Sequence, residues 1–143
     1  MGLAQSGLVK FTPLKKIKLA DGDVMHGLKS EDDGYNGFGE AYFSWINFSA
    51  VKAWKKHRKM NMNLIVPVGH VLFVFLDETK KIFCEEKIGS DRYGRLTVPR
   101  NTWFGFKGLS NPSSLLLNIA DISHDPAEVE RADFSSFNYD WGI

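Results

Sequence analysis

The stretch Lys52-Ala53-Trp54-Lys55-Lys56-His57-Arg58-Lys59, followed by Met60-Asn61-Met62-Asn63-Leu64-Ile65-Val66-Pro67-Val68-Gly69, joins a dense cationic run to an apolar run. Lysine and arginine side chains this close together repel one another, so either an anionic partner neutralises them or solvent surrounds them. The apolar run ends in glycine and has the length of a strand rather than a helix. The role of the cations therefore depends on the fold that holds them.

Short runs of aromatic and β-branched residues recur along the chain and are separated by turn signals. The strongest turn signals are Asp21-Gly22-Asp23, Asp32-Asp33-Gly34, Gly89-Ser90-Asp91 and Ser110-Asn111-Pro112. This pattern predicts an all-β protein with antiparallel sheets, a sandwich or a barrel. The expected strands are 14–19, 39–47, 51–54, 63–68, 70–77, 81–87, 95–98, 103–107 and 115–122. A short helix is expected over Asp125–Arg131, with proline near its start.

Composition limits the classes of protein to which the chain can belong. Its 143 residues have 43% hydrophobic content, which predicts a single domain over 1–143 with its core at about 12–141. The net charge of +1 argues against nucleic-acid binding. The single cysteine, Cys84, excludes an intrachain disulfide. Met1–Thr12 lacks a signal-peptide core, and Val71–Leu76 is too short to cross a bilayer, so we expect a cytoplasmic protein without membrane association.

The cationic run has two interpretations if the chain is extended through it. Strict alternation would place these residues on one face: Lys55, His57, Lys59, Asn61 and Asn63. That face suits the lining of a polar, anion-binding cavity. The alternative is a solvated edge strand, whose lysines prevent edge-to-edge pairing. A bulge between Val51 and Asn61 would exchange the two faces, so alternation alone does not settle which side points inward.

Other candidate residues also allow two roles. His124 ends an expected strand at a turn, where it lies at a pocket rim or stabilises the turn. Trp103 belongs either to the core or to a surface that stacks on a ring-shaped ligand. Glu40 begins an aromatic strand, as an edge charge or a pocket carboxylate.

Several segments resemble motifs of the cupin superfamily. His57–Gly69 resembles the first cupin motif, which reads His-x-His, then a glutamate, then a glycine after the next strand. Leu96–Phe106 resembles the second motif, and more closely the Pro-Pro-Gly-Phe-Ala-His-Gly-Phe turn of dTDP-4-dehydrorhamnose 3,5-epimerases. Lys52–His57 is similar to the epimerases' Arg-Gly-Leu-His-Tyr-Gln and to the Arg-Gly-x-His-Ala-His of sugar-nucleotide 3,4-ketoisomerases. Asp125–Glu128 resembles the Tyr-x-Pro-x-x-Glu region that closes the epimerase barrel.

The resemblance implies a double-stranded β-helix, the cupin jelly roll, assembled as a homodimer. It implies an epimerase or isomerase that acts on a 4-keto nucleotide-activated deoxysugar in surface-polysaccharide biosynthesis. The alternative is a non-catalytic cupin module that binds a sugar nucleotide or a glycan. The third hypothesis is a structural subunit in which solvent surrounds the lysine strand.

The family's functional residues are largely replaced here. The four ligand positions of metal-binding cupins read Lys55, His57, Met62 and Phe104, a set that lacks the donors for a divalent ion, so we expect no metal and no other cofactor. The epimerases' histidine base aligns with Lys55, and their tyrosine acid falls near Asn118.

The expected catalytic residues are therefore His57 or Lys55 as the base and His124 as the partner acid. Lys55 can act as a base only if burial and the neighbouring cations lower its pKa. Cations would bind the diphosphate, an aromatic ring would stack on the ligand, and amides would bind sugar hydroxyls. The expected substrate-binding residues are Lys52, Lys59, Asn61, Asn63, Trp103 and Asn118.

Overall fold

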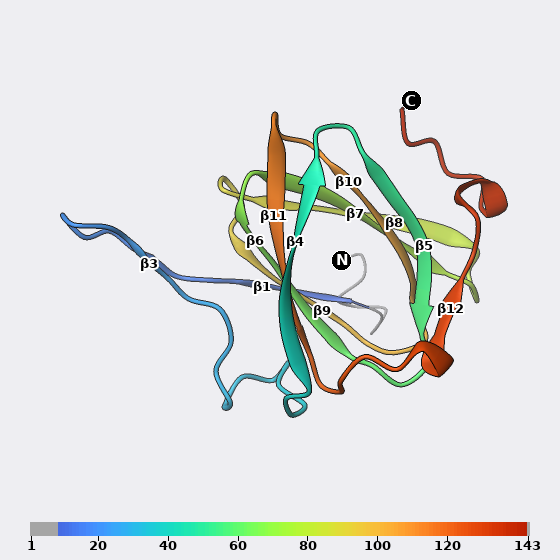
Figure 1. The fold of residues 1–143 in the computed structure, drawn as a ribbon, viewed down its shortest axis with the longest axis horizontal. Coiled ribbons are helices and arrows are strands. Elements are labelled where there is room, and N and C mark those ends of the chain that lie inside the picture. Colours follow the sequence, from blue (N-terminus) through green and yellow to red (C-terminus); the bar gives the residue numbers. More distant parts are fainter. Residues whose placement is uncertain (1–8, 143) are drawn as a thin grey trace.

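Two antiparallel sheets of five strands each enclose the interior of the molecule in a computed structural model that describes residues 9–142 (Figure 1). The first sheet contains, in spatial order, β1 (Lys10–Pro13), β9 (Gly94–Val98), β6 (Met62–Val68), β11 (Ser113–Ala120) and β4 (Glu40–Asn47). The second sheet contains β12 (Val129–Arg131), β5 (Val51–His57), β10 (Trp103–Gly108), β7 (His70–Asp77) and β8 (Ile82–Gly89). Most of the N-terminal segment considered above for a signal peptide lies outside the described residues.

Two smaller features complete the fold. The hairpin of β2 (Lys16–Ile17) and β3 (Val24–Met25) extends away from the two sheets (Figure 1). Two short 3₁₀ helices, η1 (Pro126–Glu128) and η2 (Phe134–Ser136), lie near the C-terminus. Residues 9–142 contain no α-helix.

The strand pairing confirms the predicted all-β jelly roll. Strands far apart in the sequence pair with one another, since β11 lies between β4 and β6 while β10 lies between β5 and β7. The expected strand at 51–54 continues to His57, because β12 pairs with it there. The helix expected over Asp125–Arg131 was wrong in its extent. Asp125 caps only the single turn of η1, and the residues after it pair with β5 as β12.

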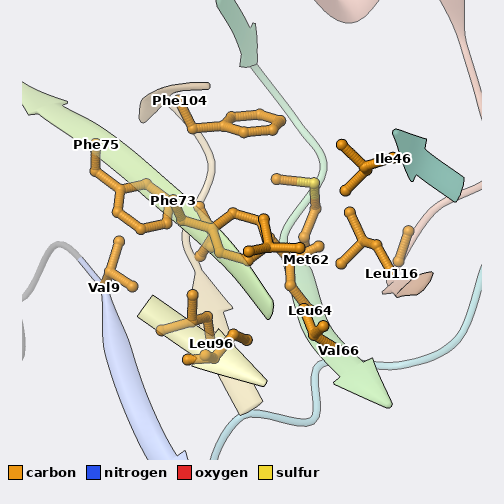
Figure 2. Close-up of a cluster of buried hydrophobic side chains, with 14 of the residues drawn as sticks. Val9, Ile46, Met62, Leu64, Val66, Phe73, Phe75, Leu96, Phe104 and Leu116 are labelled. Carbon is orange, nitrogen blue, oxygen red and sulfur yellow. The ribbon is translucent and has the colours of Figure 1, made fainter. Parts of the chain in front are cut away.

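Alternate residues of both sheets point inward and form the main core. Its members include Val9, Phe73, Phe75, Leu96 and Leu116, all less than 5% exposed. Figure 2 shows Phe73 in the middle of this cluster, with Val9 and Phe75 on one side and Leu116 on the other. Burial of these large side chains supplies the main driving force for closing the two sheets on each other.

A second apolar cluster covers the outer face of the second sheet. Trp54, Trp103 and Trp141 are buried there together with side chains of β7. The C-terminal segment closes this cluster, since the ring of Trp141 lies 5.4 Å from that of Trp54 and the Trp54 indole donates a hydrogen bond to the carbonyl of Phe134. The segment thus holds β5 from the outside.

Candidate active site

A cavity of about 430 Å³ lies between the two sheets, within the size range of small-molecule sites. One part of its lining is apolar and comes mainly from β6, β10 and β11. The other part is polar or charged and comes from β4, β5, β11 and β12. The apolar lining residues are Ala53, Trp54, Met62, Leu64, Phe104, Phe106, Leu116 and Ala132, and the polar ones are Tyr42, Ser44, Lys52, Lys55, His57, Asn118 and Arg131.

A β-bulge in β5 determines which cations reach this cavity. Phe104 pairs with Lys55 whereas Gly105 pairs with Ala53, so Trp54 has no partner on β10. Lys52 and Lys55 are three residues apart, and strict alternation would place them on opposite faces. The bulge lets both line the cavity while the Trp54 indole packs in the outer cluster.

A buried histidine–carboxylate pair lies at the end of β5. Nδ1 of His57 lies 2.5 Å from Oε2 of Glu128, and the two side chains are 6% and 1% exposed. The other carboxylate oxygen, Oε1, accepts hydrogen bonds of 2.9 Å from the backbone N–H groups of Lys59 and Met60. The pairing of Val129 with His57 places Glu128 at this position.

The surroundings of Glu128 fix its charge and the orientation of the imidazole. Burial raises the pKa of Glu128, but the hydrogen bonds from His57, Lys59 and Met60 lower it by more, so the net pKa lies below its usual value. An ionised carboxylate can only accept a hydrogen bond, so Nδ1 of His57 is the donor and Nε2 is the ring nitrogen on the other side, away from Glu128. His57 lines the cavity, so the pair has the composition of a general base held by a carboxylate.

Two positively charged side chains lie opposite each other in the cavity lining, on β5 and β12. Arg131 of β12 pairs directly with Lys55 of β5, and both line the cavity together with Lys52. Burial lowers the pKa of Lys55, Arg131 and Lys52 lower it further, and Glu128 partly offsets them. Like charges directly opposite each other on a sheet destabilise it. The arrangement is therefore suited to an anionic ligand, which would neutralise both side chains.

An amide and a phenol form a third polar group, on the first sheet. Asn118 is 3% exposed, and its Nδ2 donates a 3.0 Å hydrogen bond to Oη of Tyr42. Its Oδ1 is buried and accepts no hydrogen bond from any residue of the described chain. Both residues line the cavity.

The fold and the site can now be compared with known proteins. Protein-family models and curated protein sequences give no match. The solved structure of a dTDP-sugar isomerase from Desulfovibrio desulfuricans G20 matches with a TM-score of 0.88 and 31% identity, over 93% of this chain and 90% of that one. The chain belongs to the same family as this isomerase.

More distant matches share the fold. A dTDP-4-dehydrorhamnose 3,5-epimerase from Sulfolobus tokodaii has a TM-score of 0.82 at 18% identity, over 94% of this chain and 81% of that one. The sugar 3,4-ketoisomerase QdtA from Thermoanaerobacterium thermosaccharolyticum, solved with TDP, has a TM-score of 0.74 at 15% identity, over 87% and 88%. The structural neighbours are thus dTDP-sugar epimerases and isomerases.

The structure brings four of the nine predicted site residues to the cavity: His57, Lys55, Lys52 and Asn118. Asn61 and Asn63 lie elsewhere, because the extended alternation breaks between β5 and β6. Nδ2 of Asn61 donates to the carboxylate of Asp121, while Nδ2 of Asn63 donates to the carbonyl of Gly34 and its Oδ1 accepts from Thr97. Both amides bind to the protein itself.

The remaining three predicted residues also lie away from the cavity lining. Lys59 is exposed in the turn after β5, and His124 is exposed in the segment after β11. Trp103 faces outward, where its ring lies 5.3 Å from that of Phe137. Within the described residues, no group of three or more His, Cys, Asp or Glu side chains is arranged to hold a metal ion. No helix of residues 9–142 is long and apolar enough to cross a membrane.

Sequence reasoning missed three residues of the site: Glu128, Arg131 and Tyr42. Glu128 was part of a segment that resembles the epimerases, but its contact with His57 depends on strand pairing between residues far apart in the sequence. Arg131 was expected in a helix. Tyr42 lies in an aromatic strand, a setting typical of core residues. The alternation of Tyr42 and Ser44 with Phe43 and Trp45 was the signal that could have identified it as a site residue.

Proposed function

We propose that this protein is an epimerase or isomerase that acts on a nucleotide-activated 4-keto-6-deoxyhexose, with His57 as the base. The observation that carries the proposal is the buried His57–Glu128 pair at the wall of a cavity that also holds cations. Family membership with a dTDP-sugar isomerase supports the substrate class.

The reaction begins with removal of a proton from a carbon next to the ketone. Nε2 of His57 takes this proton, and the electron pair of the C–H bond moves to form an enolate. Glu128 stabilises the imidazolium that results, because its carboxylate faces Nδ1. Lys55, two residues before His57 on the same strand, supplies positive charge for the enolate oxygen. Return of a proton to carbon completes an epimerisation or an isomerisation.

The cations and the apolar wall suit the rest of such a substrate. Lys52 and Arg131 provide charge for the diphosphate, which arginine can bind in a bidentate manner. Phe104 and Phe106 provide apolar surface for the deoxy methyl group or the nucleobase.

Proton exchange tests this proposal directly. The protein is incubated with dTDP-4-keto-6-deoxyglucose in D₂O, and deuterium at C3 and C5 is followed by NMR. We expect exchange with the natural sequence and its loss in His57→Gln. Lys59→Met is the matched control, because it removes an exposed cation outside the cavity lining. Binding without exchange would favour a non-catalytic sugar-nucleotide module, and absence of binding would contradict the proposed substrate class.

We also propose that the protein is a homodimer. Phe43 and Trp45 of β4 are 63% and 58% exposed, and the projecting β2–β3 hairpin exposes further apolar side chains, among them Val24 and Met25. An exposed apolar face of this kind is typical of an interface. Sedimentation equilibrium should give twice the chain mass, and Trp45→Glu should shift the protein toward monomer. A monomer at micromolar concentration would contradict the proposal.

The proposed setting is surface-polysaccharide biosynthesis in the cytoplasm. The free thiol of Cys84 is compatible with a reducing compartment. Genes for a thymidylyltransferase and a 4,6-dehydratase beside the gene for this chain would support the pathway, because these enzymes supply a dTDP-4-keto-6-deoxyhexose.

A further inference from the structure

We infer that Tyr42 and Asn118 together recognise one hydroxyl group of the sugar ring and thereby select which sugars bind. The inference rests on the proposed function, because the sugar is the ligand in question. It adds a specificity site on the first sheet, across the cavity from the proposed base on the second sheet.

The first argument is the unused acceptor of Asn118. Its side chain is almost fully buried, its Nδ2 is bound to Tyr42, and its Oδ1 has no partner within residues 9–142. A buried acceptor without a partner destabilises the protein, because the acceptor has lost its hydrogen bonds to water and gained none in their place. The other amides do not show this feature, since Asn63 uses both Nδ2 and Oδ1 within the protein. The Oδ1 of Asn118 is thus available to a donor that enters the cavity.

The second argument is the direction of the Tyr42 hydroxyl. Oη of Tyr42 accepts the hydrogen bond from Asn118, so this bond does not use the phenolic hydrogen. Tyr42 pairs directly with Asn118 across β4 and β11, which holds the two groups side by side. Both residues line the cavity, and the hydrogen bond between them leaves one donor and one acceptor of the pair unused.

A hydroxyl group matches this pair, because it both donates and accepts. It can donate to Oδ1 of Asn118 and accept from the O–H of Tyr42 at the same time. A methylene group satisfies neither, and a carbonyl oxygen leaves Oδ1 without a donor. A site built to hydrogen-bond a substrate hydroxyl rejects an analogue without it strongly, because the buried polar groups are then left unpaired.

Binding of unreactive ligands tests the inference. The ligands are dTDP-6-deoxyglucose, which has no ketone to react, and its two analogues with hydrogen in place of the C2 or the C3 hydroxyl. Isothermal titration calorimetry is performed on the natural sequence, Tyr42→Phe, Asn118→Leu and the control Tyr35→Phe, whose hydroxyl lies outside the cavity lining. We expect the natural protein to bind the parent ligand about 100-fold more tightly than one of the analogues. This ratio should fall to about threefold in Tyr42→Phe and Asn118→Leu and stay unchanged in Tyr35→Phe.

The possible results separate the inference from the proposed function. If the natural protein binds all three ligands equally, or if both cavity variants weaken all three by the same factor, the inference is wrong and the function stands. The inference is also wrong if Tyr42→Phe keeps the ratio but slows deuterium exchange, since Tyr42 then acts on a proton. If the natural protein neither binds the parent ligand nor exchanges the 4-keto substrate, both fail. Leucine shares the branched shape of asparagine but is larger, and thermal unfolding verifies that each variant is folded.

Discussion

The same strands build both halves of the molecule's interior. The two halves differ in the charges and hydrogen-bonding groups that their side chains leave available to a ligand. The closed half, around Phe73 and Phe75, is apolar and fully packed. The cavity half contains His57, the opposed cations Lys55 and Arg131, and an amide oxygen that accepts no hydrogen bond from residues 9–142. The closed half contributes stability, whereas the cavity half retains charges and acceptors that only a ligand can satisfy.

A single strand shows the same contrast. Ser114 and Asn118 lie on β11, both buried and both polar. Ser114 donates to the carbonyl of His70 and accepts from its N–H, so its hydrogen bonds lie within the protein. Asn118, four residues later, lines the cavity, and its Oδ1 has no hydrogen-bond partner in the described part of the chain. Burial and polarity alone therefore do not identify the site. Asn118 differs from Ser114 because it combines an unused acceptor with a place in the cavity lining.

The largest expected effect is on catalysis in the cavity half. We expect His57→Gln to lower the rate of deuterium exchange at least about 10³-fold, because it removes the proposed base. Stability should fall by less than about 2 kcal/mol, since one hydrogen bond to Glu128 is lost or replaced. NMR exchange rates and urea unfolding measure the two effects. If His57→Gln remained active, the assignment of catalysis to His57 in the cavity half would be wrong.

The closed half should respond in the opposite way. Phe73→Ala leaves a cavity among residues that cannot collapse, and we expect it to lower the free energy of unfolding by about 3–5 kcal/mol. The deuterium exchange rate of the folded fraction should stay within about threefold of the original. Ile82→Ala is the control, because Ile82 is 47% exposed. A loss below 1 kcal/mol for Phe73→Ala, by urea denaturation, would contradict the assignment of stability to this half.

Glu128 holds both the proposed base and the backbone after β5, so its replacement should affect catalysis and stability. Glu128→Gln should slow exchange about 100-fold, because the imidazolium loses its counter-charge. The folded pKa of Glu128 lies below its usual 4.5, so the ionised form stabilises the fold above that pH. This stabilisation is lost as the pH falls through the lower, folded pKa.

The measurement is the free energy of unfolding of both proteins between pH 6 and pH 3. The natural protein should lose more stability over this range than Glu128→Gln, which has no carboxylate to protonate. The control is Glu78→Gln, which removes an exposed carboxylate in the turn after β7. It should leave the dependence of stability on pH unchanged. Identical profiles for the natural protein and Glu128→Gln would contradict the coupling between the pair and the fold.

The smallest expected effect concerns the opposed cations. Lys55→Met removes a half-buried charge that faces Arg131, so stability without ligand should stay equal or rise by about 0.5 kcal/mol. Affinity for dTDP should fall about tenfold, because Lys55 lies opposite Arg131, a cation proposed for the diphosphate, and adds to the positive charge there. Calorimetry and thermal unfolding test both effects. Lower stability with unchanged affinity would mean that Lys55 is structural.

The sequence predicted most strands because apolar runs and turn residues are local signals, as in the strand over 70–77, which matches β7. It also brought His57 forward as a candidate base. It did not reveal Glu128 and Arg131 as partners of β5, because their position depends on pairing between segments about seventy residues apart. A bulge between Val51 and Asn61 was considered, but the sequence did not place it at Trp54, whose indole packs against the C-terminal segment.

The C-terminal segment 125–142 has a consequence beyond closing the outer cluster. It contributes the carboxylate behind the base, one of the cavity's cations and the aromatic cover that holds the bulged strand. These three contributions lie within one continuous stretch, from Glu128 to Trp141, so they can be inherited together. A recombination event that replaced only this segment would exchange the charge partner and the ligand charge in one step, and leave the remaining strands of both sheets intact.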